Sequence, residues 1–157
     1  MRLSAELLGS CEQRTNALGE REIILRGLAI PAIEHLGVTR DAFDAMDFTE
    51  NRLGRLENFP RLLSPTSLCV AANVIEAMDP NNLSKNLPNL THIDLTHNQI
   101  TSLFEVSNLG KASSKLEFLS LHGNPVTSKY PLVRCVRILL LGRHSSYSQA
   151  CLPSSLT

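Results

Sequence analysis

The sequence contains no tryptophan and few other aromatic residues, since aromatic side chains make up 4% of its 157 residues. Its 15 lysines and arginines balance 15 aspartates and glutamates, so the formal net charge at pH 7 is zero. This balance gives no bulk electrostatic reason to bind nucleic acid, because non-specific binding to phosphates usually needs a basic excess. Any contact with RNA is therefore expected to be local or shared with a partner.

Long apolar runs and paired cysteines are also missing. Residues 1–6 contain no continuous apolar stretch, and no later segment approaches the roughly 18 to 20 apolar residues that a membrane helix needs. The four cysteines show neither C-x-x-C spacing nor the density of a disulfide framework. We therefore expect a soluble, non-secreted chain that contacts no membrane and keeps its cysteines as free thiols.

One motif is present in several copies. Residues 90–100 fit the pattern L-x-x-L-x-L-x-x-N-x-L at every fixed position. Further copies place asparagines 22, 25 and 26 residues apart, at Asn51, Asn73, Asn98 and Asn124. These steps lie within the period of roughly 20 to 29 residues that is typical of leucine-rich repeats. A degenerate earlier copy spans residues 23–30, with Leu28 at the asparagine position.

The repeats predict an α/β leucine-rich-repeat solenoid of about five repeats, with a concave parallel sheet and an N-terminal helical cap. In each copy, alternating apolar residues indicate a short strand that the asparagine ends by hydrogen-bonding the following turn. The connections are expected to hold no more than a turn or two of helix, and Pro65 is expected to shorten or delay the third strand. The predicted strands are 22–26, 45–49, 67–71, 92–96 and 117–121.

The two ends of the solenoid carry different signals. Ser4 is a plausible N-cap for an amphipathic helix over residues 4–16, within a cap at residues 1–20. The repeat domain is expected to span residues 1–141, with an atypical end at 130–141. This end either covers the last repeat as a makeshift strand or leaves apolar surface exposed. Residues 142–157 are rich in serine and are expected to form a flexible tail.

Strands stacked in register align equivalent positions about 4.8 Å apart, so alternate residues form one continuous outer face where a protein partner would bind. Its central column contains two carboxylates, which suits a basic amphipathic helix better than a small molecule. The predicted outward residues are Glu22, Ile24 and Arg26; Ala45, Asp47 and Thr49; Ser67, Cys69 and Ala71; His92, Asp94 and Thr96; and Phe118, Ser120 and His122.

Catalytic and metal sites are poorly supported. Asp94, Ser120 and His122 share the predicted face, but two strand positions separate Ser120 from His122 by about 6.6 Å. The sequence also supplies no oxyanion hole. His92 and His122 would lie about 13 Å apart, too far to bind one zinc ion. We therefore predict a protein that is not an enzyme and needs no cofactor or metal.

The chain resembles one particular family of leucine-rich-repeat proteins, the U2 small nuclear ribonucleoprotein A-prime subunits, over about residues 2–129. The discriminating motif is R-G-x-x-I-P-x-I-E-x-L-G followed by F-D-x-x-D-F. The residues that carry the resemblance are 3–8, 20–39, 41–51, 58–60, 87–90 and 124–127. After Lys129 the chain departs from the family, which continues with a tyrosine-rich helix, a last strand and a cap.

This resemblance implies a nuclear, non-catalytic scaffold in pre-mRNA splicing. In the family, the concave sheet grips a helix of the RNA-recognition-motif protein B-double-prime, and the pair binds a U2 small nuclear RNA stem-loop. Position carries the gripping role to Glu22, Arg26, Asp47, Asp94 and Phe118, with Asp47 and Asp94 reading basic residues. Arg2 is a candidate phosphate contact. The outer face adds Thr49, Cys69, His92, Thr96 and Ser120 to the predicted partner-binding set. The repeat alone also fits a cytoplasmic or axonemal adaptor.

Overall fold

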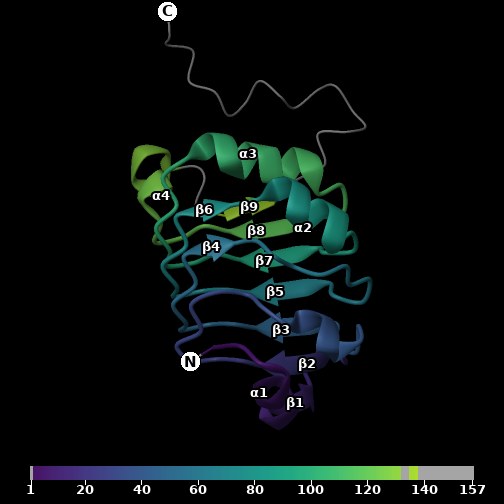
Figure 1. Cartoon of the computed structure of the whole chain (residues 1–157). Helices are drawn as coiled ribbons and strands as arrows, with labels where there is room; N and C mark the ends of the chain where they lie inside the picture. The colour runs from purple at the N-terminus through teal and green to yellow at the C-terminus, as the bar shows by residue number, and fades with distance from the viewer. Residues whose placement is uncertain (1, 132–134, 138–157) are drawn as a thin grey trace, which may run out of the picture.

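The computed structural model describes residues 2–131 and 135–137. Seven strands form one sheet in the order β1-β2-β3-β5-β7-β8-β9, and β4 pairs separately with β6. Figure 1 shows the strands of the large sheet stacked one above another, with α1 and β1 near one end and α3 near the other. In chain order the elements are α1 (Ala5–Ser10), β1 (Glu12–Thr15), β2 (Arg21–Ile24), η1 (Leu36–Thr39), β3 (Ala45–Asp47), β4 (Arg55–Leu56), β5 (Ser67–Cys69), β6 (Ala77–Met78), α2 (Pro80–Asn86), β7 (His92–Asp94), α3 (Leu103–Ala112), β8 (Phe118–Ser120), α4 (Pro125–Lys129) and β9 (Cys135–Arg137).

The five predicted parallel strands are confirmed as β2, β3, β5, β7 and β8, although each is shorter than its predicted range. The expectation that Pro65 would shorten or delay the third strand is wrong, because β5 is three residues long, as are β3, β7 and β8. Pro65 lies ahead of the first ladder bond, which Thr66 makes when its N–H donates to the Asp44 carbonyl at 2.8 Å. The missing proline N–H therefore costs the sheet nothing.

A column of apolar side chains, one from each of the five parallel strands, runs through the core. These residues pair in register and are at most 2% exposed; they are Ile23, Met46, Leu68, Ile93 and Leu119. Burial of one such side chain stabilises a fold by roughly 1.5 to 3 kcal/mol. Because side chains alternate along a strand, the flanking residues face the opposite side of the sheet, which is the concave face.

The template asparagines form a ladder of buried amides. The side-chain nitrogen of Asn98 donates to the carbonyls of Leu95 and of Val70 in the preceding repeat, each at 3.0 Å. Its side-chain oxygen accepts the N–H of Ile75 at 3.0 Å. Each asparagine thus joins its own turn to the repeat before it, a link that the sequence did not predict. Equivalent bonds are made by Asn51, Asn73 and Asn124.

The ladder also explains the degenerate first copy. Leu28 offers no amide, but its backbone N–H donates to the side-chain oxygen of Asn51 at 3.1 Å. The amide of Asn51 therefore bonds the turn of the first copy, as the later template asparagines bond the turns before them. The residue before each template position adopts a left-handed backbone, which favours glycine. These residues, with positive φ, are Gly27, Glu50, Ala72, His97 and Gly123.

The predicted helix over residues 4–16 is wrong beyond Ser10. Ser4 is the N-cap as expected, accepting the N–H of Leu7 at 3.2 Å, but residues 12–15 form β1, antiparallel to β2. The reversal depends on Asn16, whose side-chain oxygen accepts two backbone N–H groups at 3.0 Å, and on Gly19, whose φ is +82°. This turn lets β1 pair with the edge of β2, which otherwise has no neighbour on that side.

The connections hold more structure than predicted. α3 is ten residues long, which exceeds two helical turns, and β4 and β6 add a small parallel sheet outside the main one. Two capping signals explain the helices. Asp79 accepts two N–H groups at 3.0 Å ahead of Pro80 in α2, and Ser102 accepts the N–H of Glu105 at 3.3 Å in α3. None of the helices in the described residues is long and apolar enough to cross a membrane.

The C-terminal end of the sheet is β9, which pairs antiparallel with β8. The described part of this segment, residues 135–137, forms a strand, as in the makeshift-strand alternative. The predicted tail at 142–157 lies outside the described residues.

Candidate protein-binding face

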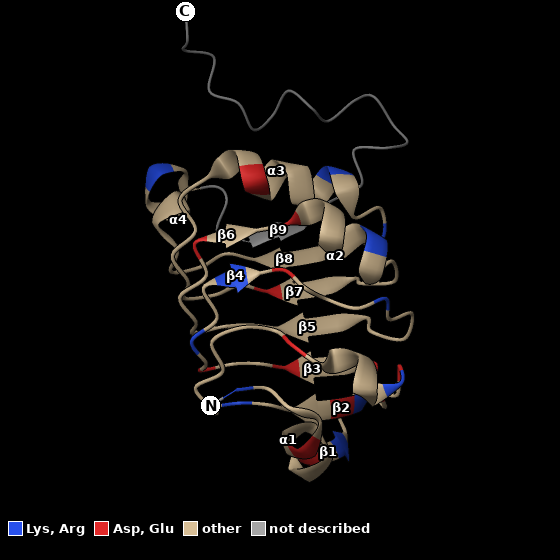
Figure 2. Cartoon of the chain, in the orientation of Figure 1, with Lys and Arg blue, Asp and Glu red and all other residues tan. Residues whose placement is uncertain are grey.

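The predicted partner-binding residues lie together on the concave face or directly after its strands. The sheet register aligns a central column in neighbouring strands, consisting of Ile24, Asp47, Cys69, Asp94 and Ser120. A second column consists of Glu22, Ala45, Ser67, His92 and Phe118. Figure 2 shows the two acidic positions of the central column in red, at the ends of β3 and β7. The arrangement of this face that the sequence predicted is confirmed.

The N-terminal part of the face is a cluster of paired charges. Arg26 lies 3.2 Å from Asp47, whose side chain is only 8% exposed. Arg14 of β1 donates to Glu22 at 2.8 Å, and this hydrogen bond is the main reason that the pKa of Arg14 is raised. Sequence reasoning missed Arg14 because it placed residues 4–16 in a helix. These four charges largely neutralise one another.

The C-terminal part of the face is aromatic and hydroxyl-rich. The rings of His92 and Phe118 lie with centroids 6.0 Å apart and planes tilted by 31°. Thr96 and Ser120 share a hydrogen bond of 2.8 Å between their hydroxyl oxygens. Phe118 is 38% exposed, so this part offers an accessible apolar surface.

Cys69 lies at the centre of the face, between the two carboxylates of the column. Its sulfur is 3.1 Å from the hydroxyl of Thr49. Burial raises the pKa of the thiol, and the neighbouring Asp47 and Asp94 raise it further, against hydrogen bonding that lowers it. The centre of the face therefore contains a neutral thiol at pH 7.

The side chains considered for a hydrolase do not converge. Asp94 and Ser120 are cross-strand partners, but the Ser120 hydroxyl bonds to Thr96. The ring of His122 instead packs edge-on against His97, with centroids 5.6 Å apart and an interplanar angle of 79°. In residues 2–131, no three side chains of His, Cys, Asp or Glu group closely enough to hold a metal ion.

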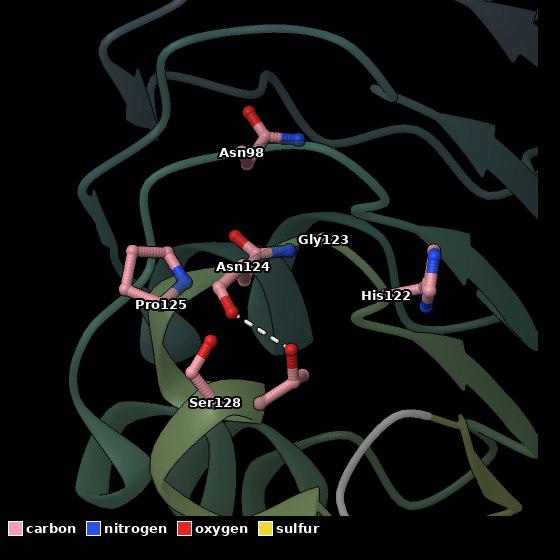
Figure 3. Close-up of a pocket in the computed structure, with 7 residues that line it drawn as sticks. Asn98, His122, Gly123, Asn124, Pro125 and Ser128 are labelled. Carbon is pink, nitrogen blue, oxygen red and sulfur yellow. Dashed lines mark hydrogen bonds between the residues drawn. The ribbon is translucent and has the colours of Figure 1, made fainter.

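An open pocket of about 570 Å³ lies where β8 meets α4 (Figure 3). It is lined by Asn98, His122, Gly123, Asn124, Pro125, Thr127 and Ser128. The amides of Asn98 and Asn124 are used by the ladder, and the hydroxyl of Thr127 donates to the carbonyl of Asn124 at 2.7 Å, the dashed line of Figure 3. Most of its polar groups thus stabilise the turns, which leaves few to bind a ligand.

Arg2, the predicted phosphate contact, precedes α1 and belongs to none of the strands of the concave face. Its guanidinium is 3.1 Å from Glu34, and its side chain is 83% exposed. The solvent-exposed pair leaves the guanidinium accessible, so the predicted role of Arg2 remains a prediction.

The stacked parallel strands, the asparagine ladder and the open concave face define a leucine-rich-repeat protein, and the family model described as "Leucine-rich repeat" matches residues 1–140. The chain is 45% identical over 127 residues to the U2 small nuclear ribonucleoprotein A' of Mycosarcoma maydis, which covers 81% of this chain and 51% of the relative. It is 42% identical over 129 residues to the Homo sapiens protein of the same name, covering 82% of this chain and 50% of the relative.

A solved structure supports the same grouping. The crystal structure of a Drosophila melanogaster SNF/U2A' complex contains a chain with 38% sequence identity and a TM-score of 0.78, covering 82% of this chain and 72% of that one. The chain belongs to the U2 small nuclear ribonucleoprotein A' family. It spans about half the length of the curated relatives that it matches.

Proposed function

We propose that this chain is a non-catalytic scaffold of the U2 spliceosomal ribonucleoprotein in the nucleus, and that its concave face grips one helix of an RNA-recognition-motif protein of the B-double-prime type. The observation that carries the proposal is the register of polar and aromatic side chains along one open sheet face, none of which belongs to the core column. Family membership and the likeness to a chain from a SNF/U2A' complex support the choice of partner.

The shape of the face suits a helix. All three residues of β3 are buried, whereas Arg26 on one side and Phe118 on the other are exposed. The face is therefore lowest at β3, and exposed side chains stand at β2 and at β8. A helix is about 10 to 12 Å across with its side chains, which corresponds to two or three strands spaced about 4.8 Å apart.

Binding to U2 small nuclear RNA would be mainly through the partner protein. The zero net charge of the chain supplies no general attraction for phosphates. Arg2 is the candidate for a local phosphate contact. The isolated chain should therefore bind a U2 stem-loop weakly, and the pair should bind it more tightly.

A binding measurement with two matched variants tests the concave face. Phe118→Ala removes an exposed ring from the face, and Phe104→Ala removes a ring that is 74% exposed on α3. With a recombinant protein of the B-double-prime type, the first change should weaken binding about tenfold or more, as expected for an aromatic anchor. The second should leave affinity unchanged. Equal effects of the two variants would show that this face is not the interface.

A pull-down from nuclear extract tests the wider assignment. The intact chain should recover the partner protein together with U2 small nuclear RNA. Recovery of cytoskeletal proteins without that RNA would instead favour the adaptor alternative.

A further inference from the structure

Asp47 and Asp94 occupy the same repeat position, two strands apart, with Cys69 between them in register. The local structure of the two is also the same. One oxygen of each carboxylate, Oδ1, accepts the backbone N–H two residues later, from Thr49 or from Thr96, at 2.9 Å in both cases. The two carboxylates are thus held in equivalent orientations.

Their second oxygens differ. Oδ2 of Asp47 lies 3.2 Å from the guanidinium of Arg26. Among the described residues, Oδ2 of Asp94 accepts one hydrogen bond, from the thiol of Cys69 at 4.0 Å, which is the limit of a weak hydrogen bond. The salt bridges in the described residues join other acids to Arg2, Arg14, Arg21, Arg26 and Arg55, and none involves Asp94.

We propose that Asp94 is the receptor for one lysine or arginine side chain of the partner helix, and that Arg26 already fills the equivalent position at Asp47. This inference rests on the proposed function, because it identifies what the concave face recognises. It also separates two carboxylates to which the sequence assigned one role. At Asp47 the chain itself supplies the guanidinium of Arg26. At Asp94 the partner would supply the corresponding cation.

The surroundings of Asp94 favour a strong and specific contact. The carboxylate is half-buried and is fixed by the N–H and hydroxyl of Thr96. The hydroxyl of Ser120 extends this network through Thr96. A cation that reaches a fixed, partly desolvated carboxylate contributes more than one at an exposed rim, which acts mainly on the association rate.

The nearby aromatic surface adds a second requirement for the partner. Ser120 is the cross-strand partner of Asp94, and Phe118 lies two residues before it. Two residues span about 6.6 Å along a strand and one strand about 4.8 Å across, so Phe118 and Asp94 are about 8 Å apart diagonally. Residues four apart in a helix are separated by about 6 Å along its axis. The face therefore fits a helix with a lysine or arginine about one turn from a large apolar residue.

Asp94→Asn is the informative change, since it removes the charge and keeps an oxygen for Thr96. Binding of the full chain to a recombinant B-double-prime protein should weaken about 10- to 100-fold, with a smaller dependence on salt concentration. Asp47→Asn should weaken binding less than Asp94→Asn does, because Arg26 already pairs with Asp47. Glu50→Gln, at an exposed residue outside the predicted partner-binding set, is the neutral control, and circular dichroism should show that each variant is folded. Partner variants in which each lysine or arginine of the helix is changed singly to glutamine complete a double-mutant cycle. For one of these partner variants, Asp94→Asn should cause little further loss of affinity.

The outcomes separate this inference from the proposed function. If Phe118→Ala weakens binding and Asp94→Asn does not, the concave face is the interface and the role given to Asp94 is refuted. If Asp94→Asn weakens binding but no single partner cation couples to it, a one-cation receptor is also refuted. If neither variant alters binding, the proposed function fails as well.

Discussion

The side-chain oxygen of Asn98 accepts the backbone N–H of Ile75 at 3.0 Å, across the boundary between two repeats. Both residues are buried, at 5% and 0% exposure. The same amide donates to carbonyls in both repeats. One side chain therefore satisfies three backbone groups that water does not reach, and its removal should be felt in two repeats at once.

Asn98→Ala should destabilise the fold by about 3 kcal/mol, because an unsatisfied buried backbone group costs about 1 to 3 kcal/mol and rearrangement recovers part of the loss. Urea unfolding followed by circular dichroism measures the change. Gln99→Ala is the matched control, since Gln99 is the adjacent residue and is exposed. It should stay within about 0.5 kcal/mol of the unmodified chain. Similar losses for the two variants would contradict a structural role for the ladder.

Gly27 and Gly123 test two separate costs at equivalent turns. Both have positive φ, +71° and +75°, but a Cβ at Gly27 would meet nothing within 4 Å, whereas one at Gly123 would overlap the ring of His97. Gly27→Ala should cost about 1 to 2 kcal/mol for backbone strain alone. Gly123→Ala should cost more. In a His97→Ala background the second cost should fall to that of the first; if it does not, steric overlap is not the cause.

The ion pair between Arg21 and Asp44 should make stability depend on pH at the acidic end. Hydrogen bonds from the Arg21 side chain and backbone lower the pKa of Asp44 from 3.8 to about 2. Because the folded-state pKa lies below the unfolded one, the stabilisation is present above about pH 4 and is lost as pH falls towards 2.

Solvent screening of this partly exposed pair should limit its contribution to about 1 kcal/mol. Urea unfolding at pH 4.5 and pH 2.5 should therefore show a larger loss for the unmodified chain than for Asp44→Asn. Identical losses for the two proteins would show that the pKa of Asp44 is the same in the folded and unfolded states.

The thiol of Cys69 should react slowly with alkylating reagents. Burial raises its pKa above the usual value of 9.0, so little thiolate is present at neutral pH. Alkylation by iodoacetamide, followed by peptide mass mapping, should be at least about tenfold slower in the folded chain than in urea. The rate should still be rising at pH 9. A folded-state rate equal to that in urea would contradict the burial of this thiol.

The positions of the five parallel strands could be predicted because two independent sequence patterns agree, the alternation of apolar residues and the spacing of the repeats. Residues such as Ile93 and Leu95 alternate as strand residues do, and the asparagines recur at the spacing of one repeat. The side of the sheet that each residue faces then follows from alternation alone. For this reason the concave positions of Asp94 and Phe118 could be assigned without coordinates.

Some elements were missed although the sequence has local signals for them, and other features depend on contacts between segments. The helical period over residues 4–16 concealed β1, although Asn16 and Gly19 carry a turn signal that a closer comparison of local patterns could have found. The length of α3 was missed although Ser102 and Glu105 have the spacing of a capping box. The pairing of Arg26 with Asp47 depends on distances between side chains of two repeats, which sequence spacing does not determine.

The antiparallel strands β1 and β9 flank a stack in which all other neighbours in the main sheet are parallel. In such a stack, each parallel strand presents to the next one the same direction and register. The outer strands break that pattern, because each of them pairs antiparallel with its neighbour. A strand of a second copy that joined either edge of the sheet would therefore meet a strand that runs opposite to the repeats, and so would not extend their shared parallel register.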